Sequence, residues 1–250
     1  MRIKVNKVNQ QNFIDFVNRL KVIDTFIYFK IKDNTVQASA YLPQRDAVKH
    51  HTLPLEDIFQ IEDGINTDKE LKIAFFDAGK LTDAFKQFQY DAIQGELDFV
   101  ENEEDFVAST FTIFSDELEI TLACSEPSLG YKDLTDAQIE GIFNLNNANY
   151  NFELDYSTLA KAKSVFSLDK EDTFSIDANN KGIRFKGKTY NMLVTPDFEG
   201  QPNGKITLFK KYLNLLDKED YVANVLDNRV VLSSNDSNTL LTIATCQTSE

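Results

Sequence analysis

Residues 152–176 read FELDYSTLAKAKSVFSLDKEDTFSI, and this stretch decides the fold. It starts with the alternating apolar residues of a strand and continues as a helix, for which Asp155 or Ser157 is a suitable N-cap. One face of that helix is apolar and carries Leu159, Ala162, Val165 and Phe166. Asp172-Thr173-Phe174 then opens another extended segment. The stretch therefore predicts a strand, a helix over 155–168 and a second strand.

The first half of the chain repeats this plan. Asp24-Thr25-Phe26 follows the first predicted helix, as Asp172-Thr173-Phe174 follows the third. Each half also closes on a similar strand, LEITLAC at 118–124 and LLTIATC at 240–246. Two matches, each in the corresponding place relative to a helix, indicate a duplication.

Each half is expected to contain several strands and two helices. The four predicted helices cover 9–22, 77–90, 155–168 and 210–217. Residues 125–149 combine proline, glycine and an Asn-rich run, which is linker composition. We predict an α+β fold of duplicated domains, 1–124 and 150–250, joined by a connector over 125–149. Each domain should have antiparallel sheets with its two helices on one face.

Composition limits the class of protein. The chain has 250 residues, of which 42% are hydrophobic, including 20 Phe, so it can form a core and is not a disordered acidic tail. No apolar run approaches the roughly 20 residues that span a bilayer, and the N-terminus lacks the apolar stretch of a signal peptide. Two Cys cannot build a disulfide framework, which fits a reducing compartment. We expect a cytoplasmic protein without a membrane partner.

Most signals of catalysis are absent from the sequence. It has no Gly-rich phosphate loop, no Cys pair at zinc spacing and no nucleophile-elbow Ser. The two histidines, His50 and His51, are adjacent, and we expect them in a solvated loop after Lys49 rather than at a metal. We therefore predict no enzymatic activity, no catalytic residue, no metal and no cofactor. An enzyme whose site is dispersed over the fold remains an alternative, because acid/base carboxylates carry no sequence signature.

Charge is unevenly distributed along the chain. The net charge is -14, yet the four predicted helices hold eight basic and five acidic residues, a net charge of +3, so the remainder carries -17. The eight basic residues are Arg19, Lys21, Lys80, Lys86, Lys161, Lys163, Lys210 and Lys211. The overall field repels phosphate and argues against a general nucleic-acid binder, but helices that alone are positive can face something negative. Ordinary solvated helix faces are the alternative, since Lys is a good helix former.

The chain resembles a known family in several segments together. They are Phe152 to Leu159 through Asp172 to Ile176, the strand-helix unit 71–88, the Pro-containing connector after Cys124 and the closing strand 240–246. In this layout the chain is similar to the DNA sliding clamps, the processivity factors of replicative polymerases. The resemblance is narrowest to the two-domain subunits of tailed phages and of proliferating cell nuclear antigen.

The resemblance implies a viral or cellular replication protein that forms a ring. Three subunits would close head to tail as a homotrimer around duplex DNA, with helices lining the hole. The eight basic residues would then face phosphates without reading bases. Such a ring tethers a DNA polymerase, has a clamp loader as a further partner and, if viral, works in the cytoplasm of the host cell. An acidic structural or assembly protein of duplicated β-rich domains is the rival interpretation.

The same resemblance implies a hydrophobic groove beside the connector, where tails of the polymerase and loader dock. The candidate lining residues are Ile139, Ile142, Phe143 and Leu145. An apolar cluster in a polar linker can mark a partner surface. It can equally be the anchor that fixes the linker to the core. The C-terminal tail after Cys246 is a further candidate for this site.

Overall fold

A computed structural model describes residues 2–5, 9–61, 69–88, 93–102, 105–129, 134–201, 205–234, 236 and 238–246. The chain folds into two compact units. The first contains Met1–Ala40 and His50–Leu134, and the second contains Tyr41–Lys49 and Thr135–Glu250. A short segment from the first half of the sequence thus belongs to the second unit. The domain bounds 1–124, 125–149 and 150–250 stay a prediction.

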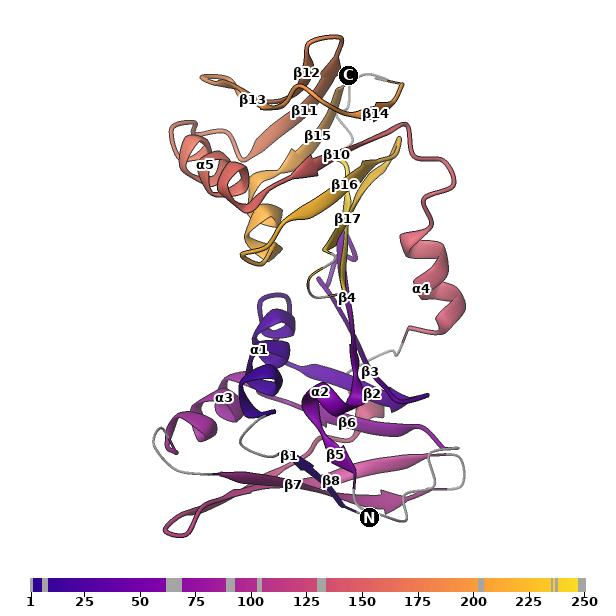
Figure 1. Cartoon of the computed structure of the whole chain (residues 1–250), viewed down its shortest axis with the longest axis vertical. Helices are drawn as coiled ribbons and strands as arrows, with labels where there is room; N and C mark the ends of the chain where they lie inside the picture. The colour runs from indigo at the N-terminus through magenta and orange to yellow at the C-terminus, as the bar shows by residue number, and fades with distance from the viewer. Residues whose placement is uncertain are drawn as a thin grey trace. The chain divides into compact units, whose positions relative to one another are not determined.

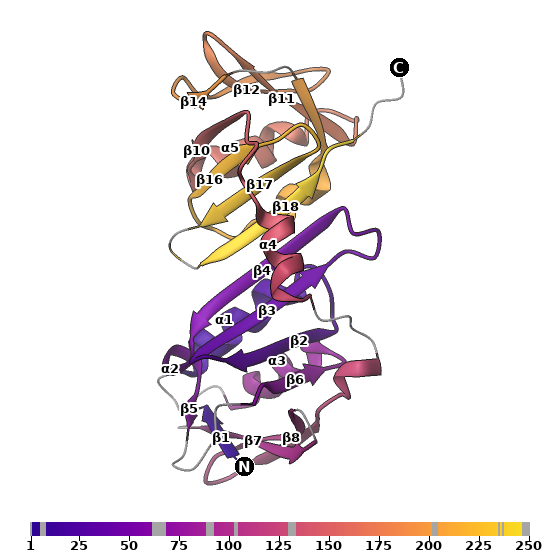
Figure 2. The same cartoon turned by 90° about the vertical axis from the view of Figure 1, so that its right-hand side faces the viewer.

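The first unit is built on a mostly antiparallel sheet (Figures 1 and 2). Its strand order is β4-β3-β2-β6-β8-β7-β1-β5, with β9 paired to β8, and the short β6–β8 contact is parallel. The strands are β1 Arg2–Val5, β2 Ile27–Lys32, β3 Thr35–Tyr41, β4 Ala47–Pro54, β5 Gln60–Ile61, β6 Leu71–Phe75, β7 Gln94–Glu101, β8 Phe106–Phe114 and β9 Glu119–Ala123.

Two main helices of this unit lie side by side on one face of its sheet, α1 (Gln10–Lys21) and α3 (Ala78–Lys86) (Figures 1 and 2). The short α2 (Leu55–Ile58) and the 3₁₀ turn η1 (Pro127–Leu129) complete the unit. The predicted inner face of α1 is buried, with Phe13 at its centre. Four aromatic rings, of Phe29, Phe59, Phe85 and Phe111, lie within 6.3 Å of the Phe13 ring. Phenylalanine thus fills the layer between helices and sheet.

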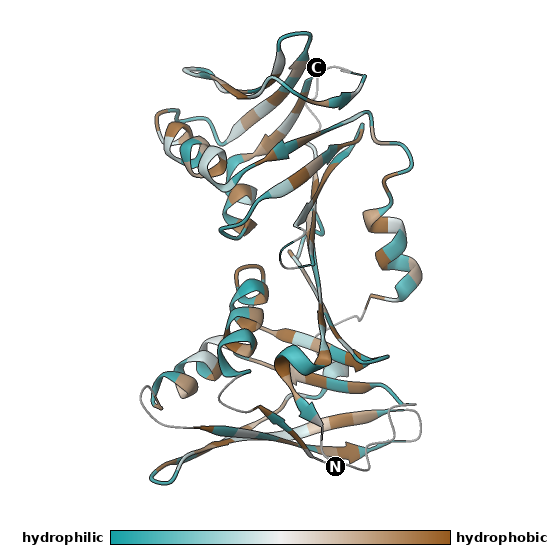
Figure 3. Ribbon diagram, viewed as in Figure 1, coloured by the Kyte–Doolittle hydropathy of each residue, from teal (hydrophilic) through white to brown (hydrophobic). Residues whose placement is uncertain are grey.

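The second unit repeats this arrangement of helices on sheet. One sheet has the order β14-β10-β16-β17-β18, and a four-stranded sheet has the order β13-β12-β11-β15. Its strands are β10 Tyr150–Leu154, β11 Thr173–Asn179, β12 Gly182–Lys186, β13 Asn191–Thr195, β14 Glu199–Gly200, β15 Lys205–Phe209, β16 Tyr221–Val225, β17 Arg229–Ser234 and β18 Thr239–Ala244. Along the strands of both units hydrophobic and hydrophilic residues alternate (Figure 3).

The helices of the second unit are α5 (Tyr156–Phe166) and the 3₁₀ helix η2 (Lys210–Leu215) on one side of the sheets, and α4 (Asp136–Phe143) on the other side (Figures 1 and 2). Asp155 is the N-cap of α5 and accepts a hydrogen bond from the Thr158 amide at 2.6 Å. Asp77 caps α3 in the same way, through the amides of Gly79 and Lys80. The predicted α+β fold, with antiparallel sheets and few helices, is confirmed.

A similar backbone hydrogen bond occurs in both units, with acceptors one position apart in the repeated motif. The Ala78 amide at the start of α3 donates to the Thr25 carbonyl, and the Lys210 amide at the start of η2 donates to the Asp172 carbonyl, both at 2.8 Å. Both acceptors belong to the repeated Asp-Thr-Phe motif. In each unit the loop after the first helix therefore fixes the start of the second helix.

One expectation is corrected by the structure. His50 and His51 lie in β4 and are buried, not in a solvated loop. Ser39 Oγ is 2.9 Å from His50 Nδ1, Thr52 Oγ1 is 3.0 Å from Nε2, and the His51 ring lies against Phe16. Adjacent strand residues point to opposite faces, so the burial of both means that both faces of β4 are covered here.

The predicted connector contains a helix, α4, that the sequence analysis did not identify. A capping box formed by Thr135 and Gln138 starts this helix. The predicted end of the second helix, Tyr90, and the tail after Cys246 lie outside the described residues, and α3 ends at Lys86. No helix in the described ranges is both long and apolar enough to cross a membrane.

Candidate nucleic-acid interface

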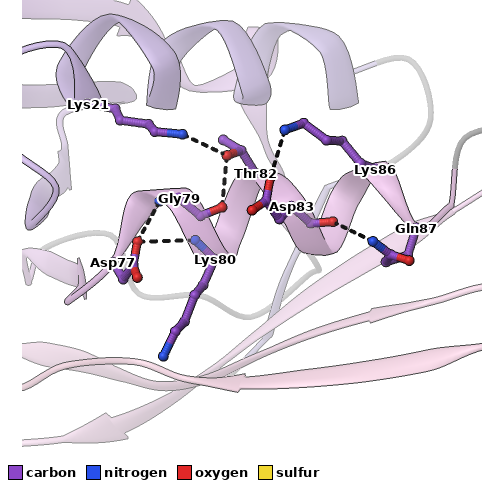
Figure 4. Close-up of polar contacts among 8 residues, drawn as sticks. All are labelled: Lys21, Asp77, Gly79, Lys80, Thr82, Asp83, Lys86 and Gln87. Carbon is purple, nitrogen blue, oxygen red and sulfur yellow. Dashed lines mark hydrogen bonds and ion pairs between the residues drawn. The ribbon is translucent and has the colours of Figure 1, made fainter.

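In the first unit the four predicted DNA-facing side chains come from α1 and α3, which are joined by a polar contact. Lys21 Nζ donates to Thr82 Oγ1 at 3.2 Å, and Thr82 Oγ1 donates to the Gly79 carbonyl at 3.0 Å (Figure 4). This chain of hydrogen bonds holds the end of α1 against the first turn of α3. A cation at the end of α1 also favours that helix terminus, because the macrodipole is negative there.

The cations of this unit differ in how far they are neutralised. Lys80 is exposed, points away from α1 and has no ion pair with any residue that the structure describes (Figure 4). Lys86 is also exposed, but its Nζ lies 2.7 Å from Asp83 Oδ1. That hydrogen bond lowers the pKa of Asp83, so the carboxylate stays charged and offsets Lys86. Arg19 is half-buried. Lys80 is therefore the most available cation of the four.

In the second unit α5 supplies Lys161 and Lys163. Lys161 is exposed, whereas Lys163 is half-buried. Burial lowers the pKa of Lys163, and the nearby Asp217 carboxylate opposes that change. The positive charge of Lys163 is thus partly balanced within the protein, and Lys161 is the freer of the two.

The remaining two lysines lie on η2 and make contacts of different kinds. Lys210 Nζ donates to the carbonyls of Phe166 and Asp169, both at 3.1 Å, and so closes the carboxyl end of α5. Lys211 is exposed, and its Nζ lies 5.3 Å from the ring centroid of Phe209 and 5.0 Å from that of Tyr212. Lys210 therefore has a structural role, while Lys211 can reach an external anion.

Within each unit the four cations share one helical layer. α1 packs beside α3, and α5 beside η2, each pair on one side of its own sheet (Figures 1 and 2). Two acidic partners, Asp83 and Asp217, were missed from the sequence. Asp83 could have been identified from its i, i+3 spacing to Lys86. Asp217 has no such sequence signal, since it is remote in sequence from Lys163. Binding of DNA by the eight residues stays a prediction.

The four residues predicted to line a partner groove lie on α4 and directly after it. Phe143 is buried, Ile139 and Ile142 are half-buried, and Leu145 is exposed. Arg229 Nη2 donates to the Asn144 carbonyl at 3.0 Å, at the carboxyl end of α4. Phe143 thus fixes the connector to its own unit, and Leu145 is the side chain most open to a partner. The described residues contain no group of three or more His, Cys, Asp or Glu that could hold a metal.

Comparison with known proteins gives a result only at the level of structure. No protein-family model matches the chain, and no curated protein matches its sequence. Among solved structures, the complex described as the C-terminal region of FEN-1 bound to A. fulgidus PCNA (proliferating cell nuclear antigen) contains a matching chain. The TM-score is 0.69 and the identity 16%, over 99% of this chain and 100% of that one.

Two further archaeal structures match equally completely. The PCNA2–PCNA3 complex from Sulfolobus tokodaii gives a TM-score of 0.66 at 14% identity, over 98% of this chain and 99% of that one. PCNA from Thermococcus kodakaraensis gives 0.67 at 14% identity, over 98% and 100%. The identities are too low to carry residue roles, but the coverage includes both units. The chain has the fold of the PCNA-type DNA sliding clamps.

Proposed function

We propose that this chain is a DNA sliding clamp, a non-enzymatic ring that encircles duplex DNA and tethers a replicative polymerase. The observation that carries the proposal is the placement of eight cations on the helical layers of a clamp fold, in a chain that carries -17 outside the four predicted helices. Lysines facing phosphates release counterions and attract any sequence equally. The acidic remainder repels DNA, which confines it to the helical layers.

The proposal gives the cations unequal weight. Lys80, Lys161 and Lys211 are exposed and are the main phosphate ligands. Lys86 contributes less because Asp83 offsets it, and Lys210 least because two carbonyls hold its ammonium group. Flexible lysines that contact phosphates without reading base edges leave the ring free to move along the duplex.

Ring closure is supported by two strand edges. β9 pairs only with β8, and β13 is the end strand of its four-stranded sheet, so each leaves one edge open among the described strands. Large apolar side chains are exposed next to them, Leu118 before β9 and Leu193 on β13. An open edge offers unpaired backbone groups to a further strand. We propose that β9 of one subunit pairs with β13 of the next.

Charge favours this pairing. The turn before β9 and β9 itself carry the acidic residues Asp116, Glu117 and Glu119. β12, the neighbour of β13, and the turn between them carry the basic residues Arg184, Lys186 and Lys188, two of which also have acidic partners within the unit. Two different, complementary surfaces give head-to-tail contacts, which close into a ring when the rotation fits. A homotrimer is the proposed closed form.

Partner proteins complete the proposal. One matching structure holds the C-terminal region of FEN-1 on PCNA. By analogy, tails of the polymerase and of a clamp loader would dock on this chain beside α4, with Ile139, Ile142 and the exposed Leu145 as contacts.

The proposal is tested by mass and by retention on DNA. In solution the protein should have about three times its chain mass of 28.5 kDa. Lys80→Glu with Lys161→Glu should release the loaded ring from nicked circular duplex at lower salt. Removal of one phosphate ligand reduces the slope of log K against log salt by about 0.9. Lys181→Glu with Lys205→Glu is the matched control, since both lysines are exposed on the four-stranded sheet, in the β11–β12 turn and on β15. A monomer at high concentration, or equal retention by both variants, would contradict the proposal.

A further inference from the structure

An exposed aromatic ring marks the start of α3. Phe76 lies between β6 and the N-cap Asp77, and its side chain is 78% exposed. A hydrophobic residue at this position often packs on the fourth helical residue as a staple. Here that residue is Leu81, which is buried in the core while Phe76 remains in solvent. The exposure of Phe76 is therefore not explained by helix capping.

The aromatic ring of Phe76 is nevertheless held in a defined place. Phe26 contacts it at a centroid distance of 6.4 Å with the ring planes at 88°. The loop that carries Phe26 is fixed by the hydrogen bond from Ala78 to the Thr25 carbonyl and by the Phe26 amide, which donates to Asp24 Oδ1 at 3.0 Å. Edge contact with one neighbour leaves most of the Phe76 ring accessible.

The second unit has a similar arrangement of two aromatic rings at the start of η2. Phe209 immediately precedes η2, is partly exposed and meets Tyr212 at 86° and 5.7 Å. The hydrogen bond from Lys210 to the Asp172 carbonyl fixes this corner, as its counterpart does in the first unit. Lys211 Nζ lies 5.3 Å from the Phe209 ring. Both repeats therefore place a phenylalanine, exposed at position 76 and partly exposed at position 209 and held edge-on by a second aromatic ring, directly before a helix that carries predicted DNA-facing lysines.

We propose that Phe76 and Phe209 are stacking sites for unpaired nucleotides at the ends of the helical layers, an inference that rests on the proposed DNA-binding function. A flat apolar ring beside an ammonium group offers what one nucleotide needs, a surface for the base and a charge for the phosphate. At Phe76 the proposal assigns this part to Lys80, the exposed lysine four residues further along the chain, on the first turn of α3. At Phe209 the cation is Lys211.

The size of the patch favours a nucleotide over a protein. A standard protein interface buries about 800 Å² on each partner, far more than one ring with an edge contact provides. Charges of the opposite sign are also present: Asp24 and Asp77 lie beside Phe76, and Glu171 and Asp172 lie near Phe209. Asp24 and Asp77 already accept backbone amides. Binding of single strands should therefore be weak and strongly salt-dependent.

The chain contains no Trp, which provides a direct test. Phe76→Trp and Phe209→Trp each place one fluorophore at one proposed site. Stacking of thymine should quench Trp emission when oligo-dT is added at low ionic strength. The matched control is Val100→Trp, at an exposed apolar position on β7 away from the helices. Equal quenching at position 100, or no response at positions 76 and 209, would overturn the proposal.

Affinity gives the second measurement. Phe76→Ala should weaken oligo-dT binding at least about fivefold, the lower end of base–aromatic stacking, while Phe76→Tyr should restore it and Val100→Ala should leave it unchanged. Retention on circular duplex, measured on the same variants, should stay normal.

These outcomes separate the stacking sites from the clamp itself. If the Trp variants do not respond to oligo-dT but are still retained on duplex DNA, the stacking proposal alone is refuted. If the unaltered protein is not retained on duplex DNA, the clamp proposal is refuted. Emission of the Phe76→Trp variant that changes with a polymerase and not with oligo-dT would assign the site to a protein and overturn the stacking proposal.

Discussion

Lys49 is fully buried, and its ion pair with Asp217 gives the sharpest prediction of how substitutions change the free energy of unfolding. Its Nζ donates to Asp217 Oδ2 at 2.7 Å and to the Leu215 carbonyl at 3.1 Å, both within the second unit. Asp217 is only partly buried, with its side chain 19% exposed. The two partners therefore stand to lose different amounts when the pair is broken, because only Lys49 has no access to water.

The two single substitutions should differ in a definite direction. Asp217→Asn leaves a charged, fully buried ammonium group and should cost about 3 kcal/mol, at the low end for breaking a buried pair. Lys49→Met keeps a similar volume and leaves a carboxylate that water reaches, so its cost should be ~1 kcal/mol or less. Combining both should recover most of the loss caused by Asp217→Asn.

Urea unfolding at one fixed protein concentration measures these differences, since assembly makes stability depend on concentration. Thermal unfolding offers a second readout, and about 3 kcal/mol corresponds to ~6–12 °C for a chain of this size. Lys218→Met, at an exposed lysine next to Asp217, is the control. Equal costs for the two single variants, with additive effects in the double variant, would refute the reasoning.

Three further predictions follow from other polar contacts. Asp83→Asn should strengthen duplex retention and raise its salt slope by up to ~0.9, because Lys86 loses its intramolecular partner; an unchanged slope would show that Lys86 does not face phosphate. Asp155→Ala should cost about 1 kcal/mol through loss of the α5 N-cap. Hydrogen bonds lower the pKa of Asp155 in the folded state, so its contribution is present above its unfolded pKa and is lost as the pH falls through the folded value; a pH-independent difference from wild type would contradict this. Arg229→Met should speed hydrogen exchange in α4 without unfolding the rest, because the carbonyl at its carboxyl end loses its donor; uniform protection would argue against this anchor.

The helices of the first unit could be predicted from sequence because local signals agree with burial. Apolar spacing around Phe13 and Phe85 marks the inner faces, and Asp77 stands where a cap is needed. The positions of the lysines are local features of the sequence too, so their placement on helices could be predicted. The contacts of each ammonium group could not be predicted, because partners such as Asp217 come from distant parts of the chain.

The features that the sequence analysis did not identify have equally specific causes. α4 has only eight residues and is flanked by polar segments, so composition favoured a linker, although the capping box of Thr135 and Gln138 was a usable signal. His50 and His51 are polar neighbours, which is typical of a loop. Only tertiary structure reveals that both faces of β4 are covered and that Ser39 and Thr52 satisfy the His50 ring.

The membership of Tyr41–Lys49 in the second unit has a consequence for dividing the chain. Lys49 and Asp46 reach their partners Asp217 and Tyr212 there, so a fragment made from either half of the sequence alone would separate these partners. A fragment ending at residue 124 would lack the Asp217 carboxylate that Lys49 contacts, and one starting at 125 would lack the Asp46 carboxylate that the Tyr212 hydroxyl contacts. A cut between the two sequence halves is therefore not a cut between the two folded units.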